Sequence, residues 1–346
     1  MNKVVIIGGG FAGMHIAREL EKDFDVTLID SKDYFEFTPS ILRTIVEPEH
    51  IKKIQVLHNY YLKRAKVIVE CVQMVSNNYV ILEDNKKVNF DYLAICSGSS
   101  YNIPFKEKDI IKVTRAKHLR DCYDDLRKAK KVLIVGGGLV GVELAAEIQT
   151  HYGDKEITII HSKDRLMERT HGKSIKHAEN FLKKRGVKII YGERAEKNRG
   201  NIYITHKKRK IEMDMAFLCT GITPNYDFMK KNFGDKLNPK GFIKVNEYLQ
   251  LEGYHNIFAV GDVSDRTEEK TAQNAERQAR IVVKNIFALE KKDKITKYHS
   301  KRTPLVISLG KYNGILDLGN FVLTGFIPGL LKSFIEWKEM RNLKKS

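Results

Sequence analysis

The sequence predicts an α/β protein made of two similar units, each built on a parallel sheet, followed by a small C-terminal region. One observation is a pattern of apolar strand, glycine-rich turn and amphipathic helix, which occurs at the N-terminus and again from residue 130. The other is the length, because 346 residues are enough for two domains that each bury a core. With 42% hydrophobic and 30% charged residues, the composition is that of a globular protein.

Both units contain a GxGxxG motif between the strand and the helix. The segments are "KVVIIGGGFAGMHIAREL" and "KKVLIVGGGLVGVELAAEI", with the motif glycines Gly8, Gly10 and Gly13 in the first and Gly136, Gly138 and Gly141 in the second. The first glycine permits a tight turn, the second lets the backbone approach a pyrophosphate, and the third lets helix and strand pack closely. The helix N-terminus then offers unpaired N–H groups to the anion. The sequence therefore predicts two dinucleotide-binding units of the Rossmann type.

The second strand of each unit ends differently. In "LIDSKD" the strand ends at Asp30, 17 residues after Gly13, where a carboxylate can bind the two ribose hydroxyls of an adenine dinucleotide. In "IIHSKD" His161 stands at the corresponding place. A carboxylate there would repel the 2′-phosphate of NADPH, and Lys163 or Arg165 nearby could attract it. We therefore expect both NADH and NADPH to be used, with the preference left open.

Later strands end in small-residue turns. They lie in "FDYLAICSGSS", "MAFLCTGITPN" and "NIFAVGDVSD". These turns resemble the ATG-type and GD-type motifs of the two-dinucleotide flavoprotein oxidoreductases. The resemblance implies a glutathione-reductase-like arrangement, with a discontinuous FAD-binding domain at 1–108 and 248–298, an NAD(P)H-binding domain at 109–247, and a C-terminal region at 299–346. An isolated Gly-Asp pair would otherwise be read as an ordinary turn.

The likeness extends to particular branches of that family. The loop "DYFEFTPSILR" and the helix "TAQNAERQAR" resemble the flavin-side loop and the quinone-side helix of type II NADH dehydrogenases. The segments "GGGLVGVELAAEI", "ITIIHS", "LCTGI", "IKVNEYLQLEGYHNIFAVGD" and the C-terminal tail resemble the ferroptosis suppressor branch of the apoptosis-inducing-factor-like oxidoreductases. The resemblance implies an FAD-dependent NAD(P)H:quinone oxidoreductase, in which hydride passes from NAD(P)H to FAD and electrons then pass to a quinone.

The motifs and the resemblance together predict the site residues. The cofactor-binding set, beyond the six motif glycines, is Phe11, Ala12, Asp30, Ser31, Lys32, Pro39, Ser97, Gly98, Leu139, Val140, Glu143, His161, Gly221, Gly261, Asp262 and Ala272. The resemblance implies catalytic roles for Glu143 and Lys332, whereas dipole complementation at a helix start and a plain surface lysine are the alternatives. It also implies a quinone side formed by Gln273, Arg277 and Phe334. No metal site is expected.

The chain departs from the family pattern at three places. Cys96 replaces a small residue in the first turn, and Arg277 stands where type II dehydrogenases often carry Gln, whereas Gln273 and Gln278 fit. Asn2 occupies the position that N-myristoylation requires to be glycine, so a membrane contact needs another source. The four cysteines have no CxxC spacing, which indicates separate buried thiols.

The C-terminus is the predicted source of membrane contact. From residue 327, an apolar stripe with a tryptophan runs along one side of the expected helix, and basic residues flank it. The stripe consists of Ile327, Leu330, Leu331, Phe334, Ile335, Trp337 and Met340. Docking of this helix on the protein's own core is the alternative, and both can hold in part. No segment is long and apolar enough to span a bilayer, and no signal peptide is visible. We expect a cytoplasmic protein, peripheral on a membrane, with a homodimer as an open option.

The net charge of +18 leaves other functions open. It favours binding of an acidic electron carrier, such as a rubredoxin or ferredoxin, over a neutral one. It is also compatible with a redox-sensing or nucleic-acid-binding effector, although no nucleic-acid module is recognisable and no nucleic acid is expected as a partner. A solvated lysine-rich surface is the plainest alternative.

Overall fold

The computed structural model describes residues 1–101 and 114–345. Its first sheet has the order β19-β9-β1-β2-β5, with every neighbouring pair parallel. These strands are β1 (Lys3–Ile7), β2 (Asp25–Asp30), β5 (Lys66–Val69), β9 (Tyr92–Ile95) and β19 (Ile257–Ala259). The central strands β1 and β9 are buried almost throughout, as expected for a parallel sheet covered on both faces.

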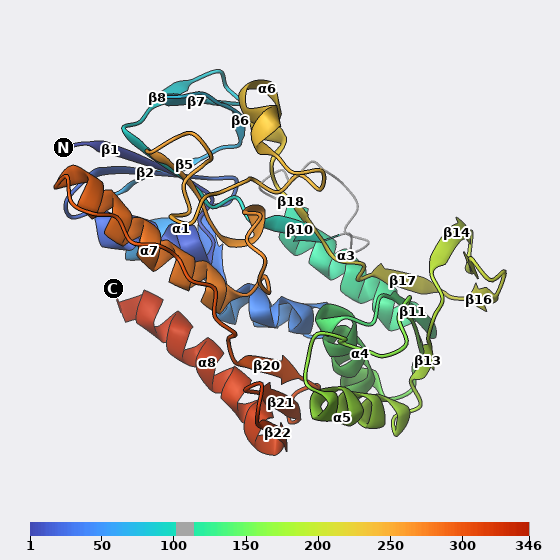
Figure 1. The fold of residues 1–346 in the computed structure, drawn as a ribbon. Coiled ribbons are helices and arrows are strands. Elements are labelled where there is room, and N and C mark those ends of the chain that lie inside the picture. Colours follow the sequence, from blue (N-terminus) through green and yellow to red (C-terminus); the bar gives the residue numbers. More distant parts are fainter. Residues whose placement is uncertain (102–113, 346) are drawn as a thin grey trace.

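The second sheet repeats this plan. Its order is β13-β12-β11-β17, again parallel, and its strands are β11 (Lys131–Val135), β12 (Glu156–Ile160), β13 (Lys188–Ile190) and β17 (Met215–Leu218). Figure 1 shows the two parallel sheets in separate halves of the molecule. The predicted α/β class and its two dinucleotide-binding units are thus confirmed.

Helices cover the sheets. In the first half, α1 (Phe11–Leu20) packs against α7 (Ala272–Glu290), which follows the last strand of the sheet. In the second half, α3 (Thr114–Lys128), α4 (Leu139–Tyr152) and α5 (Gly172–Lys183) surround the four-stranded sheet. Both α1 and α4 begin directly after a glycine turn, so their N-termini lie at the carboxyl ends of β1 and β11, where ligands of such sheets bind.

Two antiparallel strands connect the halves. They are β10 (Ser99–Tyr101) and β18 (Ile222–Pro224), and they carry the chain into the second half and back. The predicted boundary at 108 lies outside the described residues. Ahead of the return boundary predicted at 247, Met229, Phe233 and Ile243 already belong to the first core. This returning segment contains η3 (Asp227–Met229), α6 (Lys230–Phe233) and η4 (Gly234–Lys236).

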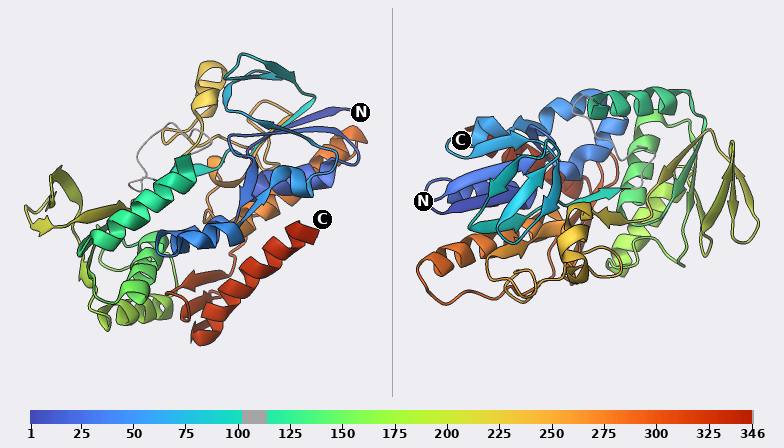
Figure 2. Two further views of the ribbon diagram at one scale, coloured as in Figure 1. Left: turned by 180° about the vertical axis from the view of Figure 1, so that it is seen from behind. Right: turned by 90° about the horizontal axis from the view of Figure 1, so that it is seen from above.

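Both halves also contain smaller antiparallel sheets and short helices. Three antiparallel sheets are formed by β3 (Tyr34–Glu36) with β4 (Gln55–Leu57), by β6 (Val72–Val75), β7 (Tyr79–Leu82) and β8 (Lys87–Asn89), and by β14 (Ala195–Arg199), β15 (Ile202–Thr205) and β16 (Lys210–Glu212). The short helices η1 (Thr38–Ile45), η2 (Pro48–Lys53), α2 (His58–Tyr61) and η5 (Gly261–Val263) complete the set. The β14–β16 sheet projects from the edge of the second half in every view (Figures 1 and 2).

The C-terminal region bridges both halves. It consists of an antiparallel sheet, β20 (Leu305–Ser308), β21 (Gly314–Asp317) and β22 (Val322–Gly325), and of the long helix α8 (Phe326–Lys345). The sheet contributes Ile307 and Ile315 to the second core, whereas α8 contributes Met340 and Leu343 to the first. Figure 2 shows α8 running along one side of the molecule. The region therefore ties the two dinucleotide-binding halves together.

Candidate functional site

The first glycine motif has a different use for each glycine. Gly8 has φ +96°, a left-handed conformation that favours glycine, and it makes the tight turn after β1. A Cβ on Gly13 would lie 1.8 Å from the carbonyl oxygen of Gly8, so the helix can approach the turn only without a side chain. Gly10, by contrast, has nothing within 4 Å of an ideal Cβ. The turn thus leaves open space where a phosphate would approach the start of α1.

The second motif repeats these three geometries. Gly136 has φ +114°, a Cβ on Gly141 would lie 1.9 Å from the oxygen of Gly136, and Gly138 faces open space. Both turns therefore fit a dinucleotide pyrophosphate.

Asp30 is buried at the end of β2. Its Oδ2 accepts hydrogen bonds from the Gly9 N–H, at 2.8 Å, and from His58 Nε2, at 3.3 Å, and its Oδ1 accepts one from the Lys32 N–H at 3.1 Å. Burial acts to raise the pKa of this carboxyl, but the bond from His58, the charge of Lys32 and the bond from Gly9 together hold it below its usual value. Asp30 is thus a fixed carboxylate beside the first glycine turn.

His161 occupies the equivalent place in the second half. Its Nδ1 accepts a hydrogen bond from the Gly137 N–H at 3.1 Å, just as Asp30 accepts from Gly9. Its Nε2 lies 3.3 Å from Oε2 of Glu168. The histidine therefore keeps the backbone contact of the first unit and adds a carboxylate partner from the following loop.

Of the remaining predicted flavin-side residues, Phe11 and Ala12 belong to the core, whereas Lys32 is half-buried. Phe11 and Ala12 are buried, and the Phe11 ring packs edge-on against Phe35 and Phe37. Lys32 lies over the ring of Tyr34. Phe11, the first residue of α1, therefore anchors the end of the glycine turn to the core.

The turns after β9 and β19 are joined by hydrogen bonds. Ser97 Oγ donates to the carbonyl of Asn225, and the Asn225 amide donates back to the carbonyl of Ser97. Asp262 accepts a bond from Ser99 Oγ at 2.7 Å. The N–H of Gly261 donates to Gln278 Oε1, also at 2.7 Å. Gly98 and Gly261 have positive φ angles in these turns, and Gly221 has one in the turn after β17.

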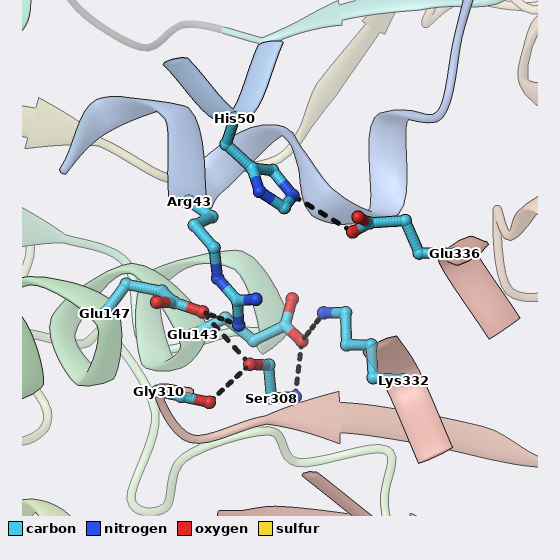
Figure 3. Close-up of polar contacts among 8 residues, drawn as sticks. All are labelled: Arg43, His50, Glu143, Glu147, Ser308, Gly310, Lys332 and Glu336. Carbon is cyan, nitrogen blue, oxygen red and sulfur yellow. Dashed lines mark hydrogen bonds and ion pairs between the residues drawn. The ribbon is translucent and has the colours of Figure 1, made fainter. Parts of the chain in front are cut away.

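An ion pair links the second nucleotide helix to the C-terminal helix. Lys332 Nζ on α8 donates to Oε1 of Glu143 on α4 at 2.6 Å, and the N–H of Ser308 donates to the same oxygen at 2.7 Å (Figure 3). The structure thus brings together the two residues predicted as catalytic. Both side chains are mostly buried, with 15% and 14% of their surface exposed.

A second ion pair lies one helical turn further along α4. Arg43 Nη2, from η1, lies 3.2 Å from Oε1 of Glu147, and Ser308 Oγ donates to the same oxygen at 3.1 Å. The Nε–H of Arg43 is buried without a hydrogen-bond partner among the described residues, which leaves one donor for a bound group.

A third pair joins η2 to α8. His50 Nε2 lies 3.1 Å from Oε2 of Glu336 (Figure 3). Burial acts to raise the pKa of Glu336, but hydrogen bonds with His50 and Ser40 and the positive charge of Arg43 keep it below its usual value.

These pairs surround one pocket. It is lined by Pro39, Ser40, Leu42, Arg43, Glu143, Glu147, Ser308, Lys332, Ser333 and Glu336. Of these, Pro39, Glu143 and Lys332 were predicted from the sequence. Arg43, Glu147, Ser308 and Glu336 were missed, although Glu147 lies four residues after Glu143 and so shares its helix face, a signal that was available.

The three residues predicted for the quinone side lie on α7 and α8. Gln273 is exposed at the start of α7, and Phe334 is exposed on α8. Arg277 instead donates to the side-chain oxygen of Asn274 and to the carbonyls of Lys301 and His299. Its guanidinium therefore fastens the segment that leads to β20.

The four cysteines are separate free thiols, as predicted. Cys96, Cys122 and Cys219 are buried, whereas Cys71 is half-buried. Burial raises the pKa of Cys219 to about 12, and burial together with Asp125 raises that of Cys122 to about 12, so the reactive thiolate forms are suppressed. Over residues 1–101 and 114–345 there is no cluster of metal-ligating side chains.

The chain is similar in sequence to one group of proteins and in fold to a further group of solved structures. The chain is 35% identical over 362 residues to apoptosis-inducing factor homolog A of Dictyostelium discoideum, covering 96% of this chain and 88% of that protein. It is 31% identical over 358 residues to human ferroptosis suppressor protein 1, covering 98% and 95%. The fold matches sulfide:quinone oxidoreductase of Aquifex aeolicus with a TM-score of 0.85 at 20% identity, over 100% and 92% of the two chains. It matches NDH2 of Plasmodium falciparum with a TM-score of 0.80 at 17% identity, over 100% and 99%.

The family assignment agrees with the geometry of the two glycine motifs. Residues 2–279 match the family described as pyridine nucleotide-disulphide oxidoreductase. FAD and a pyridine nucleotide, the predicted cofactors, are those of this family. The chain belongs to the pyridine nucleotide-disulphide oxidoreductase family.

Proposed function

We propose that this oxidoreductase is an FAD-dependent NAD(P)H:quinone oxidoreductase that works at a membrane surface. The contact between Glu143 and Lys332 carries the proposal, because it joins the start of the second nucleotide helix to a C-terminal helix whose outer face is apolar. Similarity to sulfide:quinone oxidoreductase, a quinone-linked enzyme by name, supports the proposal at the level of fold.

The proposed cofactor positions follow the two glycine turns. We assign FAD to the first glycine turn, with Asp30 at its ribose and Asp262 contacting it from the turn after β19. We assign the pyridine nucleotide to the second glycine turn, with His161 at the strand end. Bound nicotinamide and flavin supply the hydride chemistry. The chain orients them and excludes water.

Glu143 and Lys332 are the proposed catalytic residues. Lys332 holds the Glu143 carboxylate in place, and the Ser308 N–H fixes the same oxygen, so one orientation is favoured. The second oxygen of Glu143 is then available to orient a nicotinamide amide or a water molecule. Because the ion pair is largely shielded from solvent, its electrostatic effect is stronger than in water.

The outer face of α8 supports a membrane contact. Ile327, Leu330, Phe334 and Trp337 recur every three to four residues and are each 45–66% exposed, whereas Met340 and Leu343 face the core. The predicted single stripe is thus divided into a docked side and an exposed side. The Arg341 guanidinium lies over the Trp337 ring, and Lys344 and Lys345 follow. Apolar side chains beside cations suit an anionic lipid surface. Among the described residues, no helix has the length and apolar character to cross a bilayer.

An acidic electron-carrier protein is the competing acceptor, favoured by the net charge of +18. The cysteine thiols are not candidates for an electron-accepting redox disulfide, because they are not paired and their thiolate forms are suppressed.

The test is anaerobic stopped-flow reduction of the purified flavoprotein by NADH or NADPH, followed by mixing with a short-chain quinone or with an acidic iron–sulfur carrier. We expect rapid reoxidation by the quinone. Faster turnover with the carrier would refute the quinone assignment, and a protein that purifies without any flavin spectrum would refute the proposal as a whole.

A further inference from the structure

Each half carries a pair formed by a histidine and a carboxylate, and the two members exchange positions between the halves. In the first half, the carboxylate is on the strand end and the histidine approaches from outside, since Asp30 Oδ2 lies 3.3 Å from His58 Nε2. In the second half the histidine is on the strand end, and Glu168 Oε2 lies 3.3 Å from His161 Nε2. In both halves the strand-end residue accepts a hydrogen bond from the middle of the glycine turn.

The exchange moves the carboxylate outward. The side chain of Asp30 is 9% exposed and that of His58 is completely buried. The side chain of His161 is 9% exposed, whereas that of Glu168 is 36% exposed. The second half therefore also has a carboxylate at this strand end, but it comes from the following loop and has a solvent-facing side.

The loop that carries Glu168 is anchored next to the glycine turn. Leu166 and Met167 are buried, and the Met167 N–H donates to the carbonyl of Gly137 at 2.9 Å. A Cβ on Gly137 would lie 2.5 Å from Leu166 Cδ2, so the loop and the turn are in direct contact. The position of Glu168 is thus fixed on one side by Met167 and on the other by His161.

We propose that Glu168 is the residue that discriminates between NADH and NADPH. This inference rests on the proposed binding of the pyridine nucleotide at the second turn. A carboxylate can accept hydrogen bonds from an adenosine ribose diol, and it repels a 2′-phosphate. The strand-end histidine leaves the preference between NADH and NADPH open, and Glu168 shifts it toward NADH.

Cations on the same loop act in the opposite sense. Lys163 and Arg165 are exposed, and Arg169 pairs with Glu269 at 3.4 Å with 76% of its side chain exposed. Exposed, solvated charges of this kind are screened and pay an entropic cost when fixed. Glu168 already lies 3.3 Å from His161 Nε2, so less side-chain entropy is lost when it contacts a ribose.

The test measures binding of the oxidised nucleotides NAD⁺ and NADP⁺ to the full-length flavoprotein by isothermal titration calorimetry. We expect Glu168→Gln to raise the affinity for NADP⁺ relative to NAD⁺ about tenfold, because one unit charge near the 2′-phosphate is removed. Glu196→Gln, at a carboxylate that pairs with Lys208 in the β14–β16 sheet, is the matched control and should leave the ratio unchanged. Thermal unfolding of each variant checks that the fold is retained.

Each outcome decides the inference. An unchanged NADP⁺/NAD⁺ ratio in a folded Glu168→Gln variant would overturn it, and so would an equal change in Glu196→Gln. If Glu168→Gln unfolds, Glu168→Ser also removes the charge and gives the same decision, because the NADP⁺/NAD⁺ affinity ratio should rise and an unchanged ratio would overturn the inference. Failure of the proposed function would give another result, because neither NAD⁺ nor NADP⁺ would then bind and neither reduced nucleotide would reduce the flavin.

Discussion

Lys332 Nζ lies 2.6 Å from Glu143 Oε1, although the two residues are 189 positions apart in the chain. The contact places α8 against the N-terminal half of α4, the second nucleotide helix. Ser308, from the C-terminal sheet, donates to the same carboxylate oxygen. The C-terminal region is therefore part of the candidate active site as well as a candidate membrane surface.

Removal of the lysine amine should slow flavin reduction. In Lys332→Met, the Glu143 carboxylate loses its ion-pair partner and its fixed orientation, so we expect the rate of flavin reduction by NADH to fall about 10- to 100-fold. Anaerobic stopped-flow absorbance of the flavin measures this rate. Lys338→Met, at an exposed lysine of the same helix, is the control. Equal losses in both variants would show that the Glu143 contact is not what matters.

His161→Asp should shift nucleotide use toward NADH. The aspartate can accept the Gly137 N–H bond as Asp30 accepts that of Gly9, but it adds a negative charge that disfavours a 2′-phosphate. The ratio of kcat/KM for NADH and NADPH measures the shift, which we expect to be about tenfold. His161→Asn is the neutral control. An unchanged ratio in the aspartate variant would mean that residue 161 does not face the adenosine ribose.

Substitutions at two glycines of the second motif should have different effects, one on stability and the other on nucleotide binding. Gly141→Ala places a Cβ 1.9 Å from the oxygen of Gly136, so we expect a loss of about 1–3 kcal/mol in unfolding free energy. Gly138→Ala adds its Cβ in open space and should unfold at the wild-type temperature, but it should raise the KM for NADH because the methyl group occupies the path of the phosphates. Calorimetric unfolding and steady-state kinetics check the pair. Lost stability in Gly138→Ala would contradict this assignment.

Asp317 should give a pH-dependent stability difference. It accepts hydrogen bonds from the N–H groups of His171 and Gly319 and from Ser174 Oγ, which links α5 to β21. Burial acts to raise the pKa of Asp317, but these bonds and the charge of Arg302 hold it below the usual 3.8. A depressed folded pKa means that the stabilisation is complete above the unfolded pKa and is lost as the pH falls through the folded one.

We therefore expect Asp317→Asn to be less stable than the wild type by about 1–3 kcal/mol at pH 7, with the difference shrinking below a pH of about 4. Denaturant unfolding across this pH range measures it. Asp227→Asn, at a carboxylate with 81% of its side chain exposed, is the control and should show little difference at any pH. A difference at Asp317 that does not change below pH 4 would mean that the carboxylate charge is not what stabilises this contact.

The exposed face of α8 should bind anionic membranes. The double variant Phe334→Ser with Trp337→Ser removes two of its exposed apolar side chains, so co-sedimentation with vesicles that contain anionic lipid should weaken about tenfold or more. Asn342→Ser, at an exposed position of the same helix, is the control. Wild-type protein that stays in the supernatant with both neutral and anionic vesicles would exclude this surface as a membrane contact.

Local sequence determined the two dinucleotide-binding units. Gly8 and Gly136 adopt positive φ angles, and Gly13 and Gly141 lie against the oxygens of Gly8 and Gly136 five positions earlier, so these requirements arise within each motif. The strand-end residues Asp30 and His161 follow from the same short-range pattern. Such features can be predicted from the order of residues alone.

Only the tertiary structure decided how these units are completed. The partners of Glu143, Glu147 and His50 come from other elements of the fold, and the loop carboxylate of Glu168 reaches His161 because Met167 is tied to the glycine turn. The same holds for α8, because the sequence predicted a single apolar stripe, and packing divides it into a docked side and an exposed side. The physical reason is that these contacts depend on the relative placement of whole helices and sheets, which the spacing of residues along the chain does not specify.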